Sequence, residues 1–265
     1  MAKKKKIIKP VVDDLITEDN YYSDYMYVTS STLKLFTDNC EKKFDYITSN
    51  PPKPSSAMRF GTAFHMLCLE DIDKFHKHYA IEPDGIDKRT TLGKKTWMEF
   101  VEKSMGKEMV SYNDYKTMTS MVISIREHLN SMMLFGCDEF EKILTWENTE
   151  HKMLCKGKPD AISHKQKYIV DLKTTRNASP EVFEEVIINQ KYHMQAAYYC
   201  DALGYKDYYI YAIEKSAPYC VCLYKLSSET LDKGRELYNE ALVKFKKFLS
   251  CQTPTDYNNS SIYTV

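Results

Sequence analysis

The chain has 265 residues, of which 43% are hydrophobic and 28% are charged, and its 37 basic and 37 acidic side chains leave a formal net charge of zero. This composition is ordinary for a globular protein that buries a core, and the length fits one large domain. A net charge of zero excludes the global positive field of a protein that coats nucleic acid. Any nucleic-acid binding must therefore come from local patches or from a metal ion that offsets its own carboxylates.

The apolar runs and the cysteine spacing argue against a membrane protein, a secreted protein and a cysteine-based metal site. No apolar run is long enough to cross a bilayer, and the basic start at residues 3–6 is not followed by the apolar stretch of a signal peptide. The eight cysteines form no Cys-x-x-Cys pair, which favours a reducing cytoplasm and no zinc or iron–sulfur site. We expect a cytoplasmic protein without a membrane partner.

The first half of the chain shows helical periodicity interrupted by breakers such as Asn50-Pro51-Pro52. The expected helices span residues 32–47, 58–70, 95–103 and 113–133. The fourth begins with Asn113 as its N-cap. Its apolar face consists of residues at helical spacing, namely Met118, Met121, Ile125 and Leu129.

From residue 141 onward the apolar pattern changes to period two. Strands over residues 141–146, 152–163 and 168–173 are expected to form a three-stranded meander. The remaining expected elements are a helical region from Ser179-Pro180 to Gly204, a strand over 208–213 that is apolar on both faces, a strand over 219–226, and a helix capped by Ser228 that runs to 249.

This succession predicts an α/β fold with a central mixed β-sheet flanked by helices. We expect a flexible basic N-terminal tail over residues 1–27 and a C-terminal tail over 251–265. The single domain between them, residues 28–250, divides into a helical part, 28–135, and a sheet-containing part, 140–250.

The most informative segment is the expected hairpin that contains Asp160 and Asp171. A turn within residues 164–167 sets a register in which Ser163 lies opposite Tyr168 and Asp160 lies opposite Asp171. Period-two geometry then sends Asp171 and Lys173 to one face of the strand. Like charges directly across a strand pair are destabilising, so the pair indicates a bound divalent cation.

This arrangement fits hydrolysis of a phosphodiester bond. One or two Mg²⁺ ions, with Mn²⁺ able to substitute, would bridge the scissile phosphate and the attacking water. A lysine beside the carboxylates can orient that water or stabilise charge on the phosphate. The spacing by itself is common in proteins, and the opposed carboxylates add specificity.

Three other features have ordinary structural explanations when taken alone. His65 lies between Phe64 and Met66 and would usually be a hydrogen-bonded core residue. Gly61, one helical turn earlier, is expected to permit close helix packing. Gln195 and Tyr199 share a helix face, where Tyr199 could simply be a core aromatic.

Four motifs, taken together in their order along the chain, favour a functional role for these residues over an ordinary structural one. They are Gly61-Thr62-Ala63-Phe64-His65, Gly157-Lys158-Pro159-Asp160, Asp171-Leu172-Lys173-Thr174-Thr175 and Tyr192-His193-Met194-Gln195-Ala196-Ala197-Tyr198-Tyr199. The series resembles PD-(D/E)XK nucleases of the RecB/RecE branch, and most closely the RecE-type exodeoxyribonuclease VIII domain of phages and prophages. The resemblance extends from about residue 27 to 249 and implies a PD-(D/E)XK core.

The resemblance also implies roles for the motif residues. His65, Asp160 and Asp171 would be metal ligands, together with the backbone carbonyl of Leu172, and Lys173 would be the catalytic lysine. Asp171 stands where the wider superfamily often has glutamate.

Supporting roles follow from the same resemblance. Gln195, with Tyr199, would complete the catalytic site and contact the DNA backbone. Glu141 matches an acidic position of the family, and a supporting role and a structural role are equally open for it. The candidate DNA-binding residues are Lys88, Arg89, Lys94, Lys95, Thr174, Tyr192 and Tyr199, although a solvated loop explains the lysine-rich cluster equally well.

The implied activity is 5′-to-3′ digestion of linear duplex DNA to mononucleotides, which leaves a 3′ overhang for a single-strand annealing protein of RecT type. The implied assembly is a ring-shaped homo-oligomer. Two alternatives stay open: an endonuclease or single-strand nuclease of the same fold, and a catalytically inactive partner that binds DNA ends during recombination.

Overall fold

The computed structural model describes residues 16–17, 20–21, 26–251 and 253–257. Most of the two expected tails, 1–27 and 251–265, lies outside these residues. The helices of the described part are α1 (Ser30–Asp38), α2 (Glu41–Ser49), α3 (Ser56–Leu69), α4 (Ile72–His78), α5 (Thr91–Lys103), α6 (Tyr112–Glu127), α7 (Met132–Phe135), α8 (Pro180–Asn189), α9 (Tyr192–Leu203) and α10 (Ser228–Leu249). Its strands are β1 (Tyr79–Ile81), β2 (Glu108–Val110), β3 (Glu139–Phe140), β4 (Leu144–Asn148), β5 (Met153–Gly157), β6 (Ala161–Ser163), β7 (Tyr168–Thr175), β8 (Asp207–Glu214) and β9 (Val221–Lys225).

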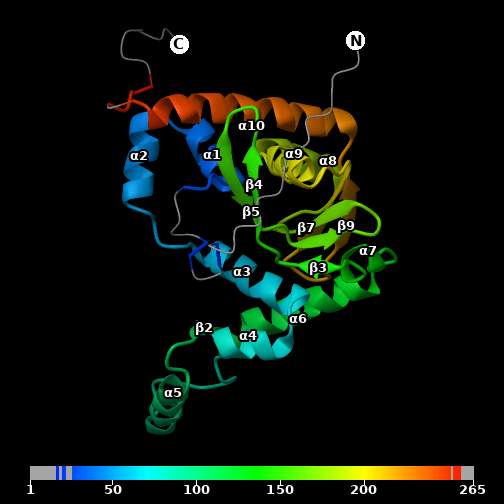
Figure 1. Ribbon diagram of the computed structural model, residues 1–265. Coiled ribbons are helices and arrows are strands. Elements are labelled where there is room, and N and C mark those ends of the chain that lie inside the picture. Colours follow the sequence, from blue (N-terminus) through cyan, green and yellow to red (C-terminus); the bar gives the residue numbers. More distant parts are fainter. Residues whose placement is uncertain (1–15, 18–19, 22–25, 252, 258–265) are drawn as a thin grey trace.

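A five-stranded sheet forms the centre of the molecule, with the order β3-β6-β7-β8-β9. Strands β7 and β8 are parallel, and the other neighbours are antiparallel. Helices α1, α8, α9 and α10 cover one face, and α3, α4, α6 and α7 lie on the other (Figure 1). The expectation of an α/β fold with a central mixed sheet flanked by helices is therefore confirmed.

The sheet separates two hydrophobic cores. Ile169 packs in the core beneath α9 and α10, whereas Val170 and Leu172 pack in the core beneath α3 and α6. This alternation follows from the period of two along β7, which places successive side chains on opposite faces. The expected central strand, β8, is buried on both faces, as its sequence predicts.

The expected register of the β6–β7 hairpin is also confirmed. Ser163 pairs with Tyr168 and Ile162 pairs with Ile169. The same register, continued by one residue beyond the start of β6, brings Asp160 to the level of Asp171. The hairpin thus delivers one carboxylate from each of its two arms to the same end of the sheet.

The expected three-stranded meander is wrong. Strands β4 and β5 pair only with each other within the described sheets, whereas β3, β6 and β7 belong to the main sheet. The continuous strand expected over 152–163 is broken between Gly157 and Ala161, because β5 pairs with β4 and with Val28, away from the main sheet. This break frees residues 158–160 to form a loop at the edge of the sheet.

The long helix expected over 32–47 is two helices, α1 and α2, with extended backbone at Asn39 and Cys40 between them. The helical region that Gly204 ends is likewise divided into α8 and α9. At that break Lys191 adopts a left-handed conformation with a φ of 54°.

Helix α6 begins one residue before Asn113, with Ser111 as its N-cap, and it ends at Glu127. Leu129 is consequently outside the helix and 99% exposed, so its expected place on the buried face is wrong. The N-cap of α10 is Ser227, one residue before the expected position.

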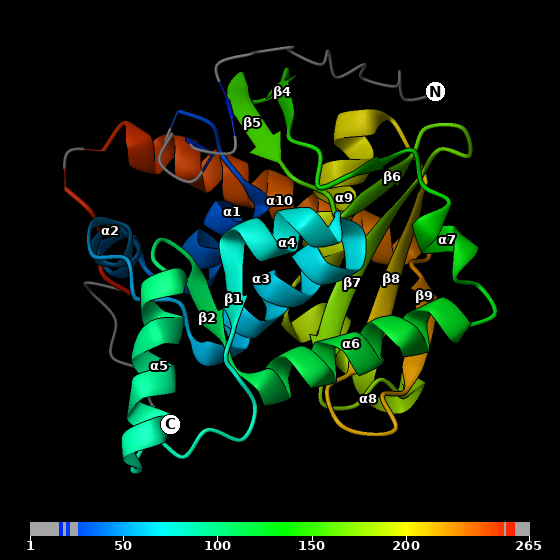
Figure 2. The ribbon, with the colours of Figure 1, turned by 90° about the horizontal axis from the view of Figure 1, so that it is seen from below.

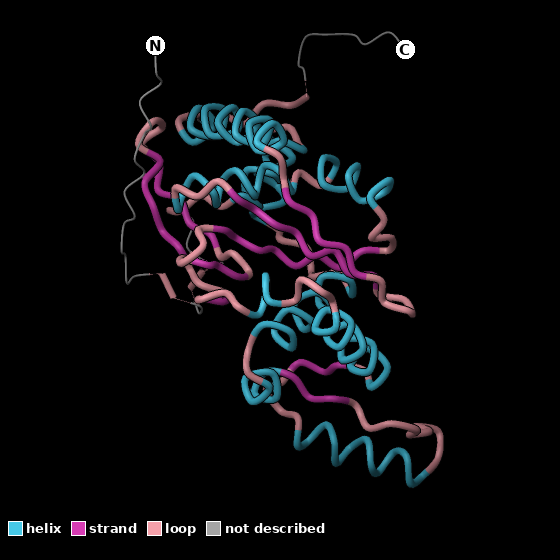
Figure 3. The backbone as a smooth tube through the Cα atoms, turned by 90° about the vertical axis from the view of Figure 1, so that its right-hand side faces the viewer, coloured by secondary structure: helices cyan, strands magenta, loops and turns pink. Residues whose placement is uncertain are grey.

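Helix α5 projects from the body, beyond the small parallel pair of β1 and β2 (Figures 1 to 3). Gly93 is the one buried residue of this helix, whereas the apolar side chains of Leu92 and Met98 are exposed. No helix in the described residues combines the length and the apolar composition needed for a membrane crossing.

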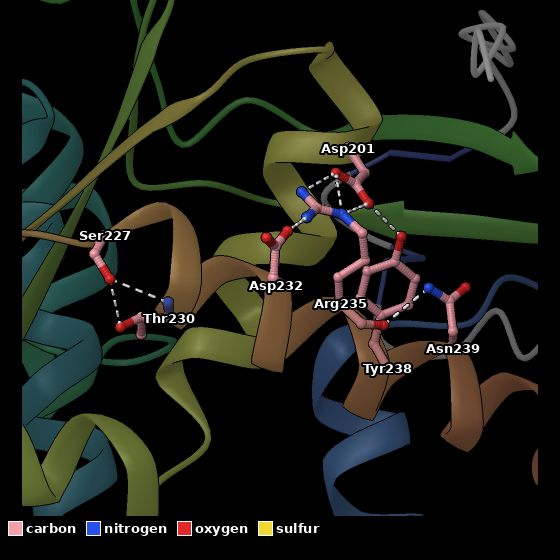
Figure 4. A network of polar contacts seen from close by, with 7 residues as sticks. All are labelled: Asp201, Ser227, Thr230, Asp232, Arg235, Tyr238 and Asn239. Carbon is pink, nitrogen blue, oxygen red and sulfur yellow. Dashed lines mark hydrogen bonds and ion pairs between the residues drawn. The ribbon is translucent and has the colours of Figure 1, made fainter. Parts of the chain in front are cut away.

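Helices α9 and α10 are locked together by charge-assisted hydrogen bonds (Figure 4). Arg235 of α10 grips Asp201 of α9 with two nitrogens at 2.8 Å, and the hydroxyl of Tyr238 donates to the same carboxylate at 2.5 Å. Bidentate pairs of this kind fix orientation as well as adding stability. They hold α9, which carries Gln195 and Tyr199, in a fixed position against α10.

Two glycines give a test of this packing. A Cβ on Gly234 of α10 would lie 2.1 Å from the carbonyl oxygen of His193, whereas a Cβ on Gly61 of α3 would have nothing within 4 Å. The idea that Gly61 permits close packing is therefore wrong. We expect Gly234→Ala to lower the free energy of unfolding by about 1–3 kcal/mol, because backbone must move. Gly61→Ala should raise it by up to about 1 kcal/mol, because alanine favours helix interiors.

Urea unfolding followed by circular dichroism measures both variants under the same conditions. The two substitutions add the same methyl group within a helix and differ in their surroundings. A change of the same sign in both would contradict the packing described for α9 and α10.

Candidate active site

The loop between β5 and β6 carries the first half of the site, Lys158-Pro159-Asp160. Its position is set by Tyr199 of α9, since a Cβ on Gly157 would lie 2.3 Å from the Tyr199 ring. The Lys158 backbone N–H also donates to the Tyr199 hydroxyl at 3.4 Å. Only glycine allows this close approach at 157, and it lets one buried tyrosine hold the loop.

Asp160 lies at the meeting point of three elements. Its Oδ2 accepts a hydrogen bond from the Leu172 backbone N–H on β7 at 2.6 Å. Its Oδ1 lies 3.4 Å from Nδ1 of His65 on α3. Its backbone carbonyl accepts from the N–H of Glu141 at 3.0 Å, so the loop between β3 and β4 is tied to the same residue.

Asp171 is 1% exposed and holds two other motif residues. Its Oδ2 forms an ion pair with Lys173 Nζ at 2.5 Å, and its Oδ1 accepts a hydrogen bond from Gln195 Nε2 at 3.0 Å. The Lys173 ammonium also lies 4.9 Å from the centre of the Tyr192 ring. The structure therefore brings Asp171, Lys173 and Gln195 together, as their places in the sequence motifs predict.

A potential metal-binding cluster lies on the other side of Asp160. Within the described residues, His65, Glu141 and Asp160 offer ligand atoms that all lie within 4.8 Å of one another. One imidazole nitrogen and two carboxylate oxygens are suitable ligands for a divalent ion. The donor set therefore fits such an ion.

Asp171, expected as a ligand, lies outside this cluster, and its two oxygens contact Lys173 and Gln195 instead; its role as a ligand stays a prediction. Leu172 faces Asp160 with its N–H, and the expected metal contact of its carbonyl stays a prediction.

Glu141 has a more central place than its sequence suggests. Its φ is 49°, a left-handed conformation that is uncommon and unfavourable for a residue other than glycine. Backbone strain of this kind persists only where the surroundings impose it, and it gathers at functional sites. The strained backbone aims the Glu141 carboxylate at His65, with Oε1 3.8 Å from Nδ1. Of the two roles left open by the sequence, this geometry favours the supporting acid.

Opposite charges are closely interleaved at the site and shift one another's proton affinities. Burial would lower the pKa of His65, but the Asp160 and Glu141 carboxylates outweigh it and raise that pKa to about 10. Burial opposes ionisation of Asp160, yet His65 and Lys173 hold its pKa below the ordinary value. Burial raises the pKa of Asp171 to about 6 despite the attraction of Lys173, and the Asp160 charge adds to the rise.

The His65 shift predicts a pH-dependent stability. A histidine whose pKa rises from 6.5 to about 10 on folding stabilises the fold fully below pH 6.5 and loses that contribution as the pH rises through 10. In chelator, His65→Gln should therefore lower the free energy of unfolding most near pH 6 and least near pH 10. Urea unfolding at these pH values measures the difference. His78→Gln, at an exposed helix end, is the control, and a His65→Gln deficit that does not change with pH would contradict the argument.

The candidate DNA-binding residues fall into two groups. The first group, Lys88, Arg89, Lys94 and Lys95, lies on or just before the projecting helix α5. Lys88 Nζ lies 3.1 Å above the centre of the Trp97 ring, and Arg89 pairs with Asp87 at 2.9 Å. The segment that carries them, helix α5, projects away from the five-stranded sheet (Figure 1), so it does not contribute to the carboxylate site.

The second group lies at the site itself. Thr174 continues β7 beyond Lys173 and is partly exposed, and Tyr192 lies against the Lys173 ammonium. Tyr199 is only 5% exposed and supports the loop that carries Lys158, so its burial does not fit a contact with DNA.

Sequence reasoning did not single out Lys158 as a site residue. Its Nζ lies 2.6 Å from Glu141 Oε2 and thus contacts the metal-binding cluster directly. The available signal was its place in the same motif, two residues before Asp160.

Comparisons with known proteins agree with the observed fold. Residues 29–260 match the family described as a PDDEXK-like domain of unknown function (DUF3799). A search of curated proteins gives no match. Among solved structures, a candidate exonuclease from Eubacterium rectale is similar, with a TM-score of 0.67 and 15% identity over 96% of each chain. A phage-related exonuclease from Haemophilus somnus has a TM-score of 0.36 and 12% identity, covering 88% of this chain and 99% of the other, which is too weak to argue a shared fold.

The family match covers most of the chain, and the Eubacterium rectale structure shares its fold. The expected membership of the PD-(D/E)XK superfamily is confirmed, whereas assignment to the RecE-type branch stays a prediction. The chain belongs to the PDDEXK-like family DUF3799 and has its nuclease-like fold.

Proposed function

We propose that the protein is a Mg²⁺-dependent exonuclease that digests duplex DNA in the 5′-to-3′ direction, releases mononucleotides and leaves 3′ single strands for recombination by strand annealing. The observation that carries the proposal is the convergence of Asp160 and Asp171 at one end of the sheet. Lys173 lies 2.5 Å from Asp171, and His65 lies 3.4 Å from Asp160.

PD-(D/E)XK nucleases generally depend on a divalent metal ion, and His65, Glu141 and Asp160 would hold one here. When bound, such an ion supplies Lewis-acid activation of the scissile phosphate and the attacking water. We favour Mg²⁺, with Mn²⁺ as a substitute, because carboxylate ligands dominate. Lys173 would stabilise charge that develops on the phosphate, and Gln195 would keep Asp171 in place.

The choice of an exonuclease with 5′-to-3′ polarity rests on the resemblance of the motifs to the RecE type. The solved structure from Eubacterium rectale is also described as a candidate exonuclease, which is the same class of activity. A ring-shaped homo-oligomer and an annealing partner of RecT type are part of the same proposal. Zero net charge is compatible with a ring if basic side chains gather along a central channel.

The test is degradation of end-labelled linear duplex in Mg²⁺, with a closed circular duplex and a chelator as comparisons. The proposal predicts release of mononucleotides from linear DNA, faster with a 5′-phosphate than with a 5′-hydroxyl, and no cutting of closed circles. Cutting of closed circles would favour the endonuclease alternative. A preference for single strands would favour the single-strand nuclease. DNA binding without release in either Mg²⁺ or Mn²⁺ would favour an inactive partner that binds DNA ends.

A further inference from the structure

Lys158 contacts Glu141, a carboxylate that also belongs to the metal-binding cluster. Glu141 Oε2 lies 2.6 Å from Lys158 Nζ, while Oε1 of the same carboxylate lies 3.8 Å from His65 Nδ1. One oxygen of Glu141 thus faces the cluster and the other faces an ammonium group. A divalent ion that binds Glu141 would come close to this ammonium, and the two cations would repel each other.

Glu141 and Lys158 differ in their freedom to move. The Glu141 backbone is fixed by its left-handed conformation and by its N–H bond to the Asp160 carbonyl, and its side chain is 11% exposed. The Lys158 backbone is fixed by Tyr199, but its side chain has four rotatable bonds and is 25% exposed. Of the two partners, the lysine has the longer and more exposed side chain, so it is the one that can change position while both backbones stay in place.

Lys173 offers an instructive contrast. Its ammonium lies between Asp171 and the Tyr192 ring, and its side chain is 18% exposed. The Lys173 side chain is thus less exposed than that of Lys158, which is 25% exposed where it meets Glu141. An ammonium that leaves Glu141 towards solvent would meet the phosphates of DNA bound at this site.

We propose that Lys158 is an exchangeable cation of the site. It neutralises Glu141 when no divalent ion is bound, and it moves to a DNA phosphate when an ion takes its place. This inference rests on the proposed function, because it assumes that DNA and a metal ion meet at the carboxylates. Its consequence is a positive coupling between metal and DNA binding that acts equally in both directions.

The test uses Ca²⁺ as the probe ion and a 5′-phosphorylated blunt duplex as the DNA. Isothermal titration measures Ca²⁺ affinity with and without duplex for the wild type and for Lys158→Met. The variant should bind Ca²⁺ at least about five-fold more tightly than the wild type when no duplex is present, because the competing ammonium is gone. In the wild type, duplex should increase the affinity for Ca²⁺ by a certain factor. In the variant, this factor should be smaller by the same fold-change.

A second measurement separates this role from a structural one. A lysine that contacts phosphate contributes about one unit to the salt slope of DNA binding. Lys158→Met should reduce the slope by about one in Ca²⁺ but leave it unchanged in chelator, because there Lys158 stays on Glu141. Lys158→Arg should restore both the coupling and the slope. Lys142→Met is the matched control, since Lys142 is adjacent to Glu141 and pairs with Glu139 at 3.6 Å.

Lys158→Gln repeats the measurements with a neutral polar side chain in case the methionine variant fails to fold. If the wild type binds both Ca²⁺ and duplex while both neutral variants match it in affinity and slope, the exchange proposal is wrong and the proposed function stands. If the loss of slope is equal in Ca²⁺ and in chelator, Lys158 contacts phosphate permanently and does not exchange. If the wild type binds neither Ca²⁺ nor duplex, the exchange and the proposed function both fail.

Discussion

Asp171→Ala is expected to reduce nucleotide release by at least about 1000-fold while DNA binding is retained. Asp171 is buried opposite Asp160 and holds both Lys173 and Gln195. Its removal frees the Lys173 ammonium and leaves Gln195 without its partner, so three groups lose their arrangement at once. Under the proposed function, DNA is held mainly through phosphate contacts elsewhere, and the substitution leaves these contacts unchanged.

Release of labelled mononucleotides from linear duplex in Mg²⁺ measures the loss, and gel shift in Ca²⁺ measures binding. Asp171→Asn keeps the shape of the side chain and an oxygen for Gln195, and it should lose nearly as much activity because the charge is gone. Asp207→Ala, which removes the partner of Lys225 at the other end of β8, is the control for loss of an acid in the sheet. If Asp171→Ala keeps an activity within roughly ten-fold of the wild type, Asp171 contributes little to the reaction. That result would exclude a catalytic site here.

Lys173→Met should have the second largest effect, on activity and on stability together. Lys173 is the partner of the buried Asp171 carboxylate, and its removal leaves that charge unpaired, which costs about 3 kcal/mol at the lower end of the usual range. We also expect a loss of activity of about 100-fold or more, because no other ammonium lies against Asp171 in the described contacts.

The stability loss has a predictable dependence on pH. The pKa of Asp171 is already raised by burial to about 6, and loss of Lys173 raises it further. A carboxyl group with a raised pKa destabilises the fold as the pH rises from 3.8 through that pKa. The deficit of Lys173→Met in chelator should therefore be largest near pH 8 and shrink towards pH 5. Lys225→Met, which breaks an exposed pair, should cost at most about 1 kcal/mol at every pH, and equal behaviour of the two variants would contradict the argument.

The parts of the structure that depend on local sequence were predictable. The β6–β7 register follows from the period of two and the polar turn, and it placed Asp160 near Asp171 correctly. Strand β8 was recognisable because it is apolar on both faces.

The parts that depend on distant contacts were not predictable. Residues 152–163 read as one strand because their apolar character continues, yet Gly157 ends β5 by packing against Tyr199, 42 residues away in the chain. The role of Glu141 was undecided for the same reason. Its left-handed backbone and its approach to His65 exist only once α3 and the β3–β4 loop meet. The helix breaks at Asn39 and Lys191 likewise occur without proline or glycine, so the local sequence did not predict them.

The position of the sheet between two separate cores has a consequence for inactivation. His65 belongs to the layer of α3, and Gln195 belongs to the layer of α9, so the proposed chemistry requires both layers to hold their alignment with the same strand ends. A slide of either layer by less than one helical turn would part His65 from Asp160, or Gln195 from Asp171, with every helix still intact. On warming, nucleotide release should consequently be lost at a lower temperature than the helical circular dichroism signal in the far ultraviolet. The difference between these two temperatures measures how firmly the layers are joined.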